Sequence, residues 1–341
     1  MRVRVDKVAS VTVNVRLGNS VSVDDIKNVK MGNVCIVRAL EEKRVYDKLE
    51  LTTGRMAKIS KGDVIAGALG ERRAIQGFAG VMPESLNRGD ILNILNIGGV
   101  LGKAISYNKE YGPPLRVELL GTAVKDGKPI NIGDNALGIS HHLELEKRVP
   151  VVVVSGTSMN SGKTEVVAKV TQELTWKSFR VCTAKVSGIA ALKDVLHMAD
   201  HGAVKAVSFL DFGYPSTAFS GDVPLIAKGA ILELLRFNPD VIIIELGDGV
   251  LGDYGVLEFF KDREIARVIT CNVVCALDPV GAWGIVKIME SNGIPVHLVS
   301  GPVTDNIVGI DYINRSLKLV GLNAFSQKEE LGDFIEKFVK K

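Results

Sequence analysis

Residues 151–164 read VVVVSGTSMNSGKT, and this run constrains the chain more than any other segment. It joins an apolar, β-branched stretch to a loop of small residues, and a helix-favouring stretch follows the Gly-Lys-Thr. In such an arrangement the backbone N–H groups of the loop and of the helix start cradle a polyphosphate. The lysine then reaches the outer phosphates and the threonine hydroxyl binds Mg²⁺. The segment therefore predicts a nucleotide-binding loop at the end of a strand.

We expect the whole loop to contact the nucleotide. The predicted cofactor-binding residues are Gly156, Thr157, Ser158, Met159, Asn160, Ser161, Gly162, Lys163 and Thr164. A chance Gly-Lys-Thr at the start of an ordinary helix is the alternative, and the strand before the loop argues against it. No Asn-Lys-x-Asp run, which reads guanine, follows the strand predicted over 267–274, so we expect ATP with Mg²⁺ rather than GTP.

From Arg148 onward, short β-branched runs alternate with stretches of 10 to 15 residues that favour helix. This alternation is typical of βαβ units and a mainly parallel sheet, so the fold class is α/β. The predicted strands cover 149–155, 179–185, 204–210, 240–245, 267–274 and 294–299. The predicted helices cover 162–176, 190–201, 222–236, 254–262, 280–291 and 327–340.

The first 145 or so residues instead favour strand. Apolar residues share one parity from Val3 to Leu17, which predicts strand across this stretch. A basic-Gly-Asp turn followed by an apolar run occurs twice, as Lys61-Gly62-Asp63-Val64-Ile65 and as Arg88-Gly89-Asp90-Ile91-Leu92. A separate pair, Asp126-Gly127, is typical of a hairpin turn. Two similar turn-strand units favour a small barrel or curled sheet. Ordinary Gly-Asp turn chemistry is the alternative to a true repeat.

A chain of 341 residues is about twice the usual domain size, so we expect two domains. The first, residues 1–145, is a mostly β domain of unknown role. The second, residues 146–341, is the P-loop nucleotide-binding α/β domain. The sequence changes from a strand-favouring pattern to alternating strand and helix patterns near residues 138–148, and we place the domain boundary there.

Composition narrows the class of partner. The 42 Lys and Arg against 39 Asp and Glu leave a net charge of +3, so we expect no nucleic-acid partner. The apolar runs stop well short of the roughly 20 residues that cross a bilayer, so we expect no membrane partner. The N-terminus does not read as a signal peptide and the four cysteines form no CxxC pair, which together favour the cytoplasm.

Three charged residues stand where strands are predicted to end. Glu245 would be costly as an isolated buried charge, and a Mg²⁺ opposite Thr164 is a ready partner. Asp211 is a second candidate metal ligand, and Lys185 joins Lys163 as a candidate catalytic residue that stabilises transferring phosphate. The plainer alternatives are a helix-capping carboxylate for Glu245, a turn cap for Asp211 and an exposed lysine for Lys185.

His197 and His201 are four residues apart on a predicted helix and could share a face with Asp194. Zinc would need a third ligand, and neither an HExxH glutamate nor a nearby cysteine supplies one. A solvated helix face is the alternative, and whether the two histidines bind metal stays open.

Five residues separate Gly156 from Gly162, one more than in the common P-loop. This variant resembles the loop of dethiobiotin synthetase and of its relatives among the cobyrinic acid amide synthases. The resemblance extends to Lys185, which matches a lysine that faces phosphates and substrate. It also extends to Glu245, which matches a Mg²⁺-binding glutamate. Leu246 and Asp248 depart from the family's Glu-Gly-x-Gly-Gly, so the loop after Glu245 is expected to have different contacts.

A closer likeness is to the P-loop domain of an uncharacterised family of NTPases. It is carried by GTSMNSGKT, by AKVSG with Lys193-Asp194, by the segment from Asp211 to Thr217, and by the turns after Glu245 and Cys275. The likeness covers about residues 149–320 and implies no settled reaction. The first domain has no counterpart in dethiobiotin synthetase.

These resemblances imply an ATP- and Mg²⁺-dependent ligase or kinase that acts on a small carboxylate-type substrate. The alternative is a nucleotide-dependent switch or chaperone that binds a partner protein through its β domain. A nucleotide-binding regulator without turnover is a third possibility. Related P-loop proteins place their sites near dimer contacts, which implies a homodimer.

Overall fold

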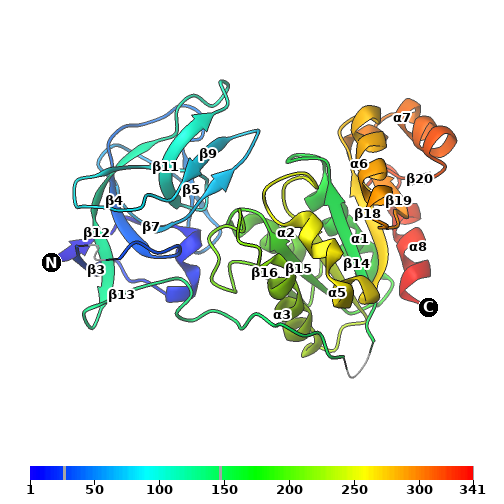
Figure 1. Cartoon of the computed structure of the whole chain (residues 1–341), viewed down its shortest axis with the longest axis horizontal. Helices are drawn as coiled ribbons and strands as arrows, with labels where there is room; N and C mark the ends of the chain where they lie inside the picture. The colour runs from blue at the N-terminus through cyan, green and yellow to red at the C-terminus, as the bar shows by residue number, and fades with distance from the viewer. Residues whose placement is uncertain (26–27, 146–147, 341) are drawn as a thin grey trace. The chain divides into compact units, whose positions relative to one another are not determined.

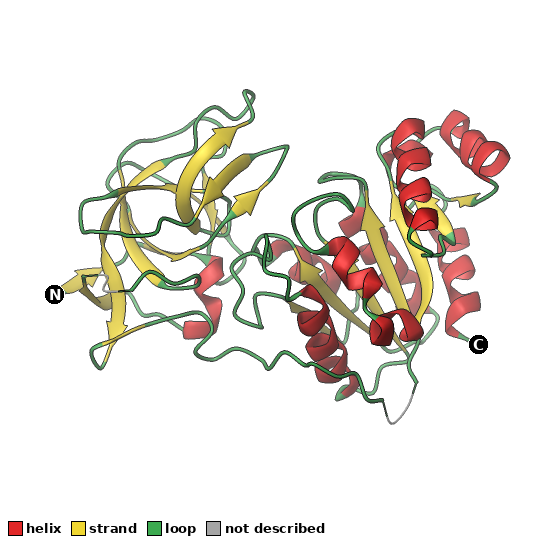
Figure 2. Ribbon diagram, in the orientation of Figure 1, coloured by secondary structure: helices red, strands yellow, loops and turns green. Residues whose placement is uncertain are grey.

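The computed structural model describes residues 1–25, 28–145 and 148–340. The chain divides into two compact units, which Figures 1 and 2 trace from the N-terminus to the C-terminus. Unit 1 comprises residues 1–138, 189–193 and 209–218, and unit 2 comprises residues 139–188, 194–208 and 219–341. The division near residue 138 falls where the sequence changes from a strand-favouring pattern to alternating strand and helix patterns. No change of sequence pattern marks the two short segments, 189–193 and 209–218, that also belong to unit 1.

Unit 2 is built on a parallel seven-stranded sheet, with the strand order β16-β15-β17-β14-β18-β19-β20. Its strands are β14 (Val151–Gly156), β15 (Val181–Ser187), β16 (Lys205–Ser208), β17 (Val241–Leu246), β18 (Ile269–Cys275), β19 (Leu298–Ser300) and β20 (Val320–Gly321). The central β14 and β17 are buried at every position, as expected for strands that are covered on both faces. The sequence predicted six of these strands and missed the two-residue β20.

In the part of the chain that the structure describes, eight α-helices connect and cover these strands. They are α1 (Lys163–Trp176), α2 (Lys193–Asp200), α3 (Val223–Leu235), α4 (Val256–Lys261), α5 (Arg263–Val268), α6 (Pro279–Ser291), α7 (Ile307–Tyr312) and α8 (Lys328–Val339). A 3₁₀ turn (Pro302–Thr304) precedes α7, and a π-helical segment (Ile313–Leu317) follows it. The sequence reading missed α5 and α7, which are six residues long and too short for a clear helical period.

The main core of unit 2 lies between the sheet and helices α1, α2 and α8. On α1, Val166, Val170 and Leu174 recur at helical spacing and are fully buried. On α8, Leu331, Ile335 and Val339 recur at helical spacing and are buried. This packing fixes the start of α1 against the end of β14, which is where the glycine-rich loop lies.

Unit 1 is a small closed barrel. Strand β12 pairs with β4, β4 with β7, β7 with β11, β11 with β10, and β10 with β12 again. The strands of unit 1 are β1 (Arg2–Arg4), β2 (Lys7–Val8), β3 (Ser20–Asp24), β4 (Val34–Ala39), β5 (Lys48–Glu50), β6 (Met56–Lys58), β7 (Val64–Leu69), β8 (Arg72–Arg73), β9 (Phe78–Val81), β10 (Ile91–Ile94), β11 (Val100–Tyr107), β12 (Arg116–Lys125) and β13 (Lys128–Pro129). Of these, β5 and β6 form a separate two-stranded sheet. Closure of the ring removes the sheet edges that an open sheet would expose. This is the small barrel that the sequence predicts.

The two Gly-Asp phrases form the same turn. Gly62 and Gly89 have φ angles of +91° and +90°, which a side chain would oppose. In each turn the aspartate accepts a bond from a backbone amide three residues earlier, at Ser60 for Asp63 and at Asn87 for Asp90. Each turn then leads into a barrel strand, β7 or β10. The repeated phrase therefore marks two equivalent corners of the barrel.

The strand predicted through residue 17 is wrong beyond β2, because Ser10–Val15 forms a 3₁₀-helix. The Thr12 amide and hydroxyl both bond to the Ala9 carbonyl, and the Val11 amide bonds to the Gly98 carbonyl. A Cβ on Gly99 would lie 2.3 Å from the Ala9 Cβ, so only glycine admits this approach. Long-range contacts therefore override the local alternation.

The segment 189–193 lies against the barrel within unit 1. The Ala190 carbonyl accepts a bond of 2.6 Å from the Asn96 side chain, and a Cβ on Gly98 would lie 2.0 Å from that same oxygen. The fully buried Glu50 carboxylate accepts bonds of 2.7 Å from the amides of Leu192 and Lys193. These contacts explain why the segment belongs to unit 1.

Three further expectations from the sequence concern a hairpin turn, the cysteines and membrane-spanning helices. Asp126 and Gly127 have φ angles of +52° and +75° between β12 and β13, as a tight hairpin turn requires. The four cysteines are buried free thiols. None of the described helices is long and apolar enough to span a bilayer.

One buried lysine of unit 2 generates a stability prediction. The Lys228 ammonium bonds to the His141 carbonyl at 3.0 Å and to the carboxylates of Asp262 and Glu264 at 2.8 Å and 2.6 Å. Burial raises the pKa of Asp262, but Lys228 together with the backbone amides of Ile265 and Glu264 outweighs this and lowers it, and Lys228 also lowers the pKa of Glu264. Carboxylates with lowered pKa values stabilise the fold above about pH 4 and lose this effect as the pH falls.

We expect Lys228→Met to lower the melting temperature at pH 7 by about 2–4 °C. The difference from the parent should shrink as the pH falls towards 3, because the two carboxylates become protonated in both proteins. Thermal melts across pH measure it, with Lys287→Met on the surface of α6 as control. An equal loss at pH 7 and at pH 3 would contradict the ion-pair explanation.

Candidate functional site

The glycine-rich loop connects the last residue of β14, Gly156, to the first residue of α1, Lys163. The Thr157 amide donates to the Cys275 carbonyl of β18, and the Val250 amide donates to the Gly156 carbonyl, both at 2.9 Å. Gly162 has a φ angle of +88° at the helix start, which favours glycine. The loop is therefore held by the strand ends on either side of β14, at the edge where ligands bind in parallel sheets.

Lys163 folds back over this loop. Its ammonium donates to the Ser158 carbonyl at 2.7 Å and lies 3.4 Å from the Ser161 hydroxyl. The side chain is 6% exposed, and burial lowers its pKa despite the nearby Glu245 carboxylate. A buried ammonium that is held mainly by neutral oxygens is well placed to exchange them for an anion.

Thr164 and Lys185 both donate hydrogen bonds to Glu245. Glu245 is the register partner of Lys185 on β15 and of Val154 on β14, so neighbouring parallel strands place these side chains together. One carboxylate oxygen, Oε1, accepts a bond from the Thr164 hydroxyl at 3.0 Å and one from the Lys185 ammonium at 2.9 Å. The structure thus brings together four of the residues predicted from the sequence, Lys163, Thr164, Lys185 and Glu245.

The second carboxylate oxygen of Glu245, Oε2, is buried and has no hydrogen-bond partner among the described residues. The side chain is 1% exposed, so bulk solvent does not reach it. An uncompensated buried carboxylate oxygen is costly, and a hard cation beside a threonine hydroxyl would satisfy it. The donor set of carboxylate and hydroxyl oxygens suits Mg²⁺ rather than a softer metal. The residues present therefore fit a magnesium ion.

Asp194 is part of this cluster, which the sequence left open beside the alternative of a solvated helix face. Its carboxylate forms an ion pair with the Lys185 ammonium, and the two side chains are 14% and 12% exposed. Burial alone would lower the pKa of Lys185, but Asp194 and Glu245 raise it above its usual value. Lys185 is therefore a protonated lysine between two carboxylates. The spacing Lys185…Asp194 carried no signal, because a strand end and a helix start meet only in the fold.

Asp211, the second predicted metal ligand, follows β16 along the chain. It lies in the segment 209–218, which belongs to unit 1, and its carbonyl accepts a bond of 2.7 Å from the Leu137 amide. Its metal role stays a prediction.

His197 lies on α2 and His201 lies one residue beyond its end, and their ring centroids are 4.4 Å apart. His197 lies 3.4 Å from the Glu165 carboxylate, and His201 lies 3.4 Å from the Lys169 ammonium. Among the described residues, no group of three or more His, Cys, Asp or Glu side chains could hold a metal. The two rings pack on each other and on the side chains of α1.

The loop after β17 packs directly on the glycine-rich loop. A Cβ on Gly249 would lie 2.2 Å from the Thr157 carbonyl oxygen, and Asp248 has a φ angle of +61°. On the other side, a Cβ on Gly301 would lie 2.3 Å from the Ser161 carbonyl oxygen. Burial raises the pKa of the neighbouring Cys275 thiol to about 12, so this cysteine is an inert neighbour of the loop.

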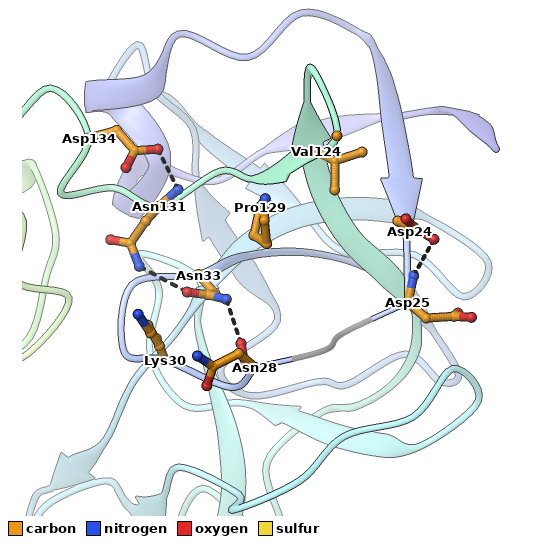
Figure 3. Close-up of a pocket in the computed structure, with 10 residues that line it drawn as sticks. Asp24, Asp25, Asn28, Lys30, Asn33, Val124, Pro129, Asn131 and Asp134 are labelled. Atoms are coloured by element: carbon orange, nitrogen blue, oxygen red, sulfur yellow. Dashed lines mark hydrogen bonds between the residues drawn. The ribbon is translucent and has the colours of Figure 1, made fainter.

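Unit 1 contains a separate polar cavity of about 540 Å³ beside the β12–β13 hairpin (Figure 3). Asp24, Asp25 and Lys30 line it together with several asparagines. The Asn131 amide donates to Asn33 at 3.0 Å, and the Asn33 amide donates to the Asn28 carbonyl at 3.2 Å (Figure 3). These carboxamides bond within the cavity wall, so their geometry does not point to a particular ligand.

The parallel sheet, the loop between β14 and α1, and the Gly-Lys-Thr at the helix start define unit 2 as a P-loop α/β domain. No family model matches the sequence, and no curated protein matches it significantly. Solved structures of other P-loop proteins resemble the chain distantly.

Three of these structures belong to the signal recognition particle system. The receptor FtsY from Elizabethkingia anophelis in complex with GDP is 15% identical, covers 59% of this chain and 67% of its own, and has a TM-score of 0.40. FtsY from Thermotoga maritima is 18% identical over 61% and 72%, with a TM-score of 0.39. The 54 kDa protein from Aeropyrum pernix in complex with GDP is 14% identical over 57% and 50%, with a TM-score of 0.40. Scores this low support no statement about the ligand or reaction of this chain.

The packing on the loop generates a second prediction. We expect Gly249→Ala to lower the free energy of unfolding by about 1–3 kcal/mol, because its Cβ would meet the Thr157 carbonyl. A Cβ on Gly284, within α6, meets nothing within 4 Å, so Gly284→Ala should instead stabilise by about 0.4–1 kcal/mol. Denaturant unfolding of both variants measures the two signs. A neutral Gly249→Ala variant would show that the two loops are not in contact.

Proposed function

We propose that unit 2 binds ATP together with Mg²⁺. The observation that carries the proposal is the buried Oε2 of Glu245, which lacks a partner among the described residues and lies on a carboxylate already bonded to Thr164. Lys163, buried at the start of α1, supports it because its neutral partners are readily exchanged for phosphate oxygens. Backbone amides of residues 157–162 would supply the rest of the phosphate cradle.

Thr164 and Glu245 would hold the metal ion, which would supply positive charge to the phosphate oxygens. Lys163 and Lys185 bring two ammonium groups to the same edge of the sheet, and the two carboxylates keep Lys185 charged. Such fixed charges stabilise a transferring phosphoryl group mainly by position. The site therefore suits phosphoryl transfer.

We further propose that the chain is an ATP-dependent ligase or phosphotransferase acting on a small carboxylate-type substrate, in keeping with the resemblance to dethiobiotin synthetase. A substrate carboxylate oxygen would bond to the γ-phosphorus as the bond to ADP breaks. A nucleophile would then displace inorganic phosphate from the acyl phosphate. Lys163 and Lys185 would offset the charge on the phosphoryl oxygens during both steps.

The binding proposal predicts a specific loss. Calorimetric titration with ATP, GTP and ADP, with and without Mg²⁺, should show metal-dependent ATP binding that exceeds GTP binding. Lys163→Ala should weaken this binding by about 10- to 100-fold, because a charged hydrogen bond to phosphate is lost. Lys287→Ala, on the surface of α6, should bind like the parent.

Binding of none of the three nucleotides by the folded parent would overturn the proposal. If ATP binds, phosphate release from the same samples tests the reaction. Release that small carboxylates stimulate supports the ligase or kinase. Release that depends on a partner protein captured through unit 1 supports the switch or chaperone instead, and binding without release supports a regulator.

We also propose that the chain forms a homodimer, as the resemblance to related P-loop proteins implies. The exposed Trp283 and Val280 on α6, which are 50% and 77% accessible, are apolar side chains that a dimer contact would cover. Sedimentation at micromolar concentration should show a dimer, and Trp283→Glu should shift it towards the monomer. A parent that sediments as a monomer at this concentration would contradict the proposal.

A further inference from the structure

Lys185 is the charged centre of the site, and two carboxylates compete for it. One is Glu245 on the adjacent strand β17, at 2.9 Å, and the other is Asp194 in the first turn of α2. The side chains of Lys185, Glu245 and Asp194 are only 12%, 1% and 14% exposed, respectively. Because little water screens the cluster, the way the ammonium is shared sets the charge that Glu245 presents.

The charge of Asp194 changes the net charge of the site. Asp194, Lys185 and Glu245 together carry one net negative charge, and the nearby Lys163 ammonium brings the four side chains to zero. Without the Asp194 charge, the other three would carry one net positive charge. A site of that charge would repel a divalent cation.

We propose that Asp194 is a positioning residue that draws the Lys185 ammonium away from full pairing with Glu245 and so sets the affinity of the site for the divalent cation that accompanies the nucleotide. This inference rests on the proposed function, because it assigns a role within the same site. It goes beyond that function by placing the control of cation affinity on α2. Asp194 itself binds neither nucleotide nor metal in this scheme.

A structural role is the competing explanation. An acidic side chain in the first turn of a helix stabilises the helix through its dipole, whatever the partner. Such a role predicts that the loss of the Asp194 charge destabilises the fold and affects every ligand alike. The positioning role predicts that only the affinity for the cation falls, and that this loss depends on Lys185.

The experiment is a calorimetric titration of ATP into the full chain over a series of Mg²⁺ concentrations. Asp194→Asn keeps the shape of the side chain and removes its charge, and we expect the half-saturating Mg²⁺ concentration to rise about tenfold. ATP binding in the absence of a divalent cation should not weaken, because the site becomes more positive. Asp194→Glu should restore most of the parent behaviour, and Asp200→Asn, an exposed aspartate at the other end of α2, is the matched control.

A double-mutant cycle separates the two roles. When Lys185 is already replaced by Met, Asp194→Asn should change the half-saturating Mg²⁺ concentration much less. On a logarithmic scale, this change should be no more than about a third of the change that Asp194→Asn causes in the parent. The reason is that Asp194 would then act on the cation only through its own, weaker electric field. Equal shifts in both backgrounds would assign Asp194 a structural or direct electrostatic role and overturn the proposal.

The outcomes distinguish this inference from the function on which it rests. A parent that binds Mg²⁺ and ATP together, with an unchanged requirement in the Asp194→Asn variant, overturns the inference and leaves the proposed function standing. A folded parent that binds no nucleotide overturns both. Thermal melts of each variant confirm that the comparison is made between folded proteins.

Discussion

The site of unit 2 depends on one buried carboxylate. Glu245 is the penultimate residue of a strand that is buried at every position, where an ionised side chain is stable only if its charge is compensated. The Thr164 hydroxyl and the Lys185 ammonium compensate one oxygen, and the other has no hydrogen-bond partner among the described residues. Three elements, α1, β15 and β17, therefore converge on a single residue, and the parallel register of the sheet makes this convergence possible.

Close backbone contact is the second constraint. The glycine-rich loop is packed between the loops that follow β17 and β19, where Gly249 and Gly301 leave no room for a side chain. A phosphate cradle made of backbone amides needs such support, because its donors act only if their directions are fixed. The glycines outside the Gly-Lys-Thr motif are thus as much a part of the site as those within it.

Local signals were strong where they reflect a short-range rule. The βαβ alternation predicted six strands of the parallel sheet, the Gly-Asp phrases predicted two turns, and the Gly-Lys-Thr run predicted the loop between β14 and α1. The stretch through Val11 and Val15 shows the limit, because its alternation fits a strand while contacts from Gly98 and Gly99 impose a 3₁₀-helix. Helices as short as α5 and α7 have too few turns to show a period.

The sequence by itself determined four candidate site residues that the fold brings together: Lys163 and Thr164 at a helix start, with Lys185 and Glu245 near strand ends. It did so because parallel strands bring their carboxyl ends to one edge. Only the tertiary structure decided that Asp194 joins this cluster, whereas Asp211 belongs to unit 1. Which helix starts and loops meet a strand end depends on long-range packing, and no spacing along the chain records that packing.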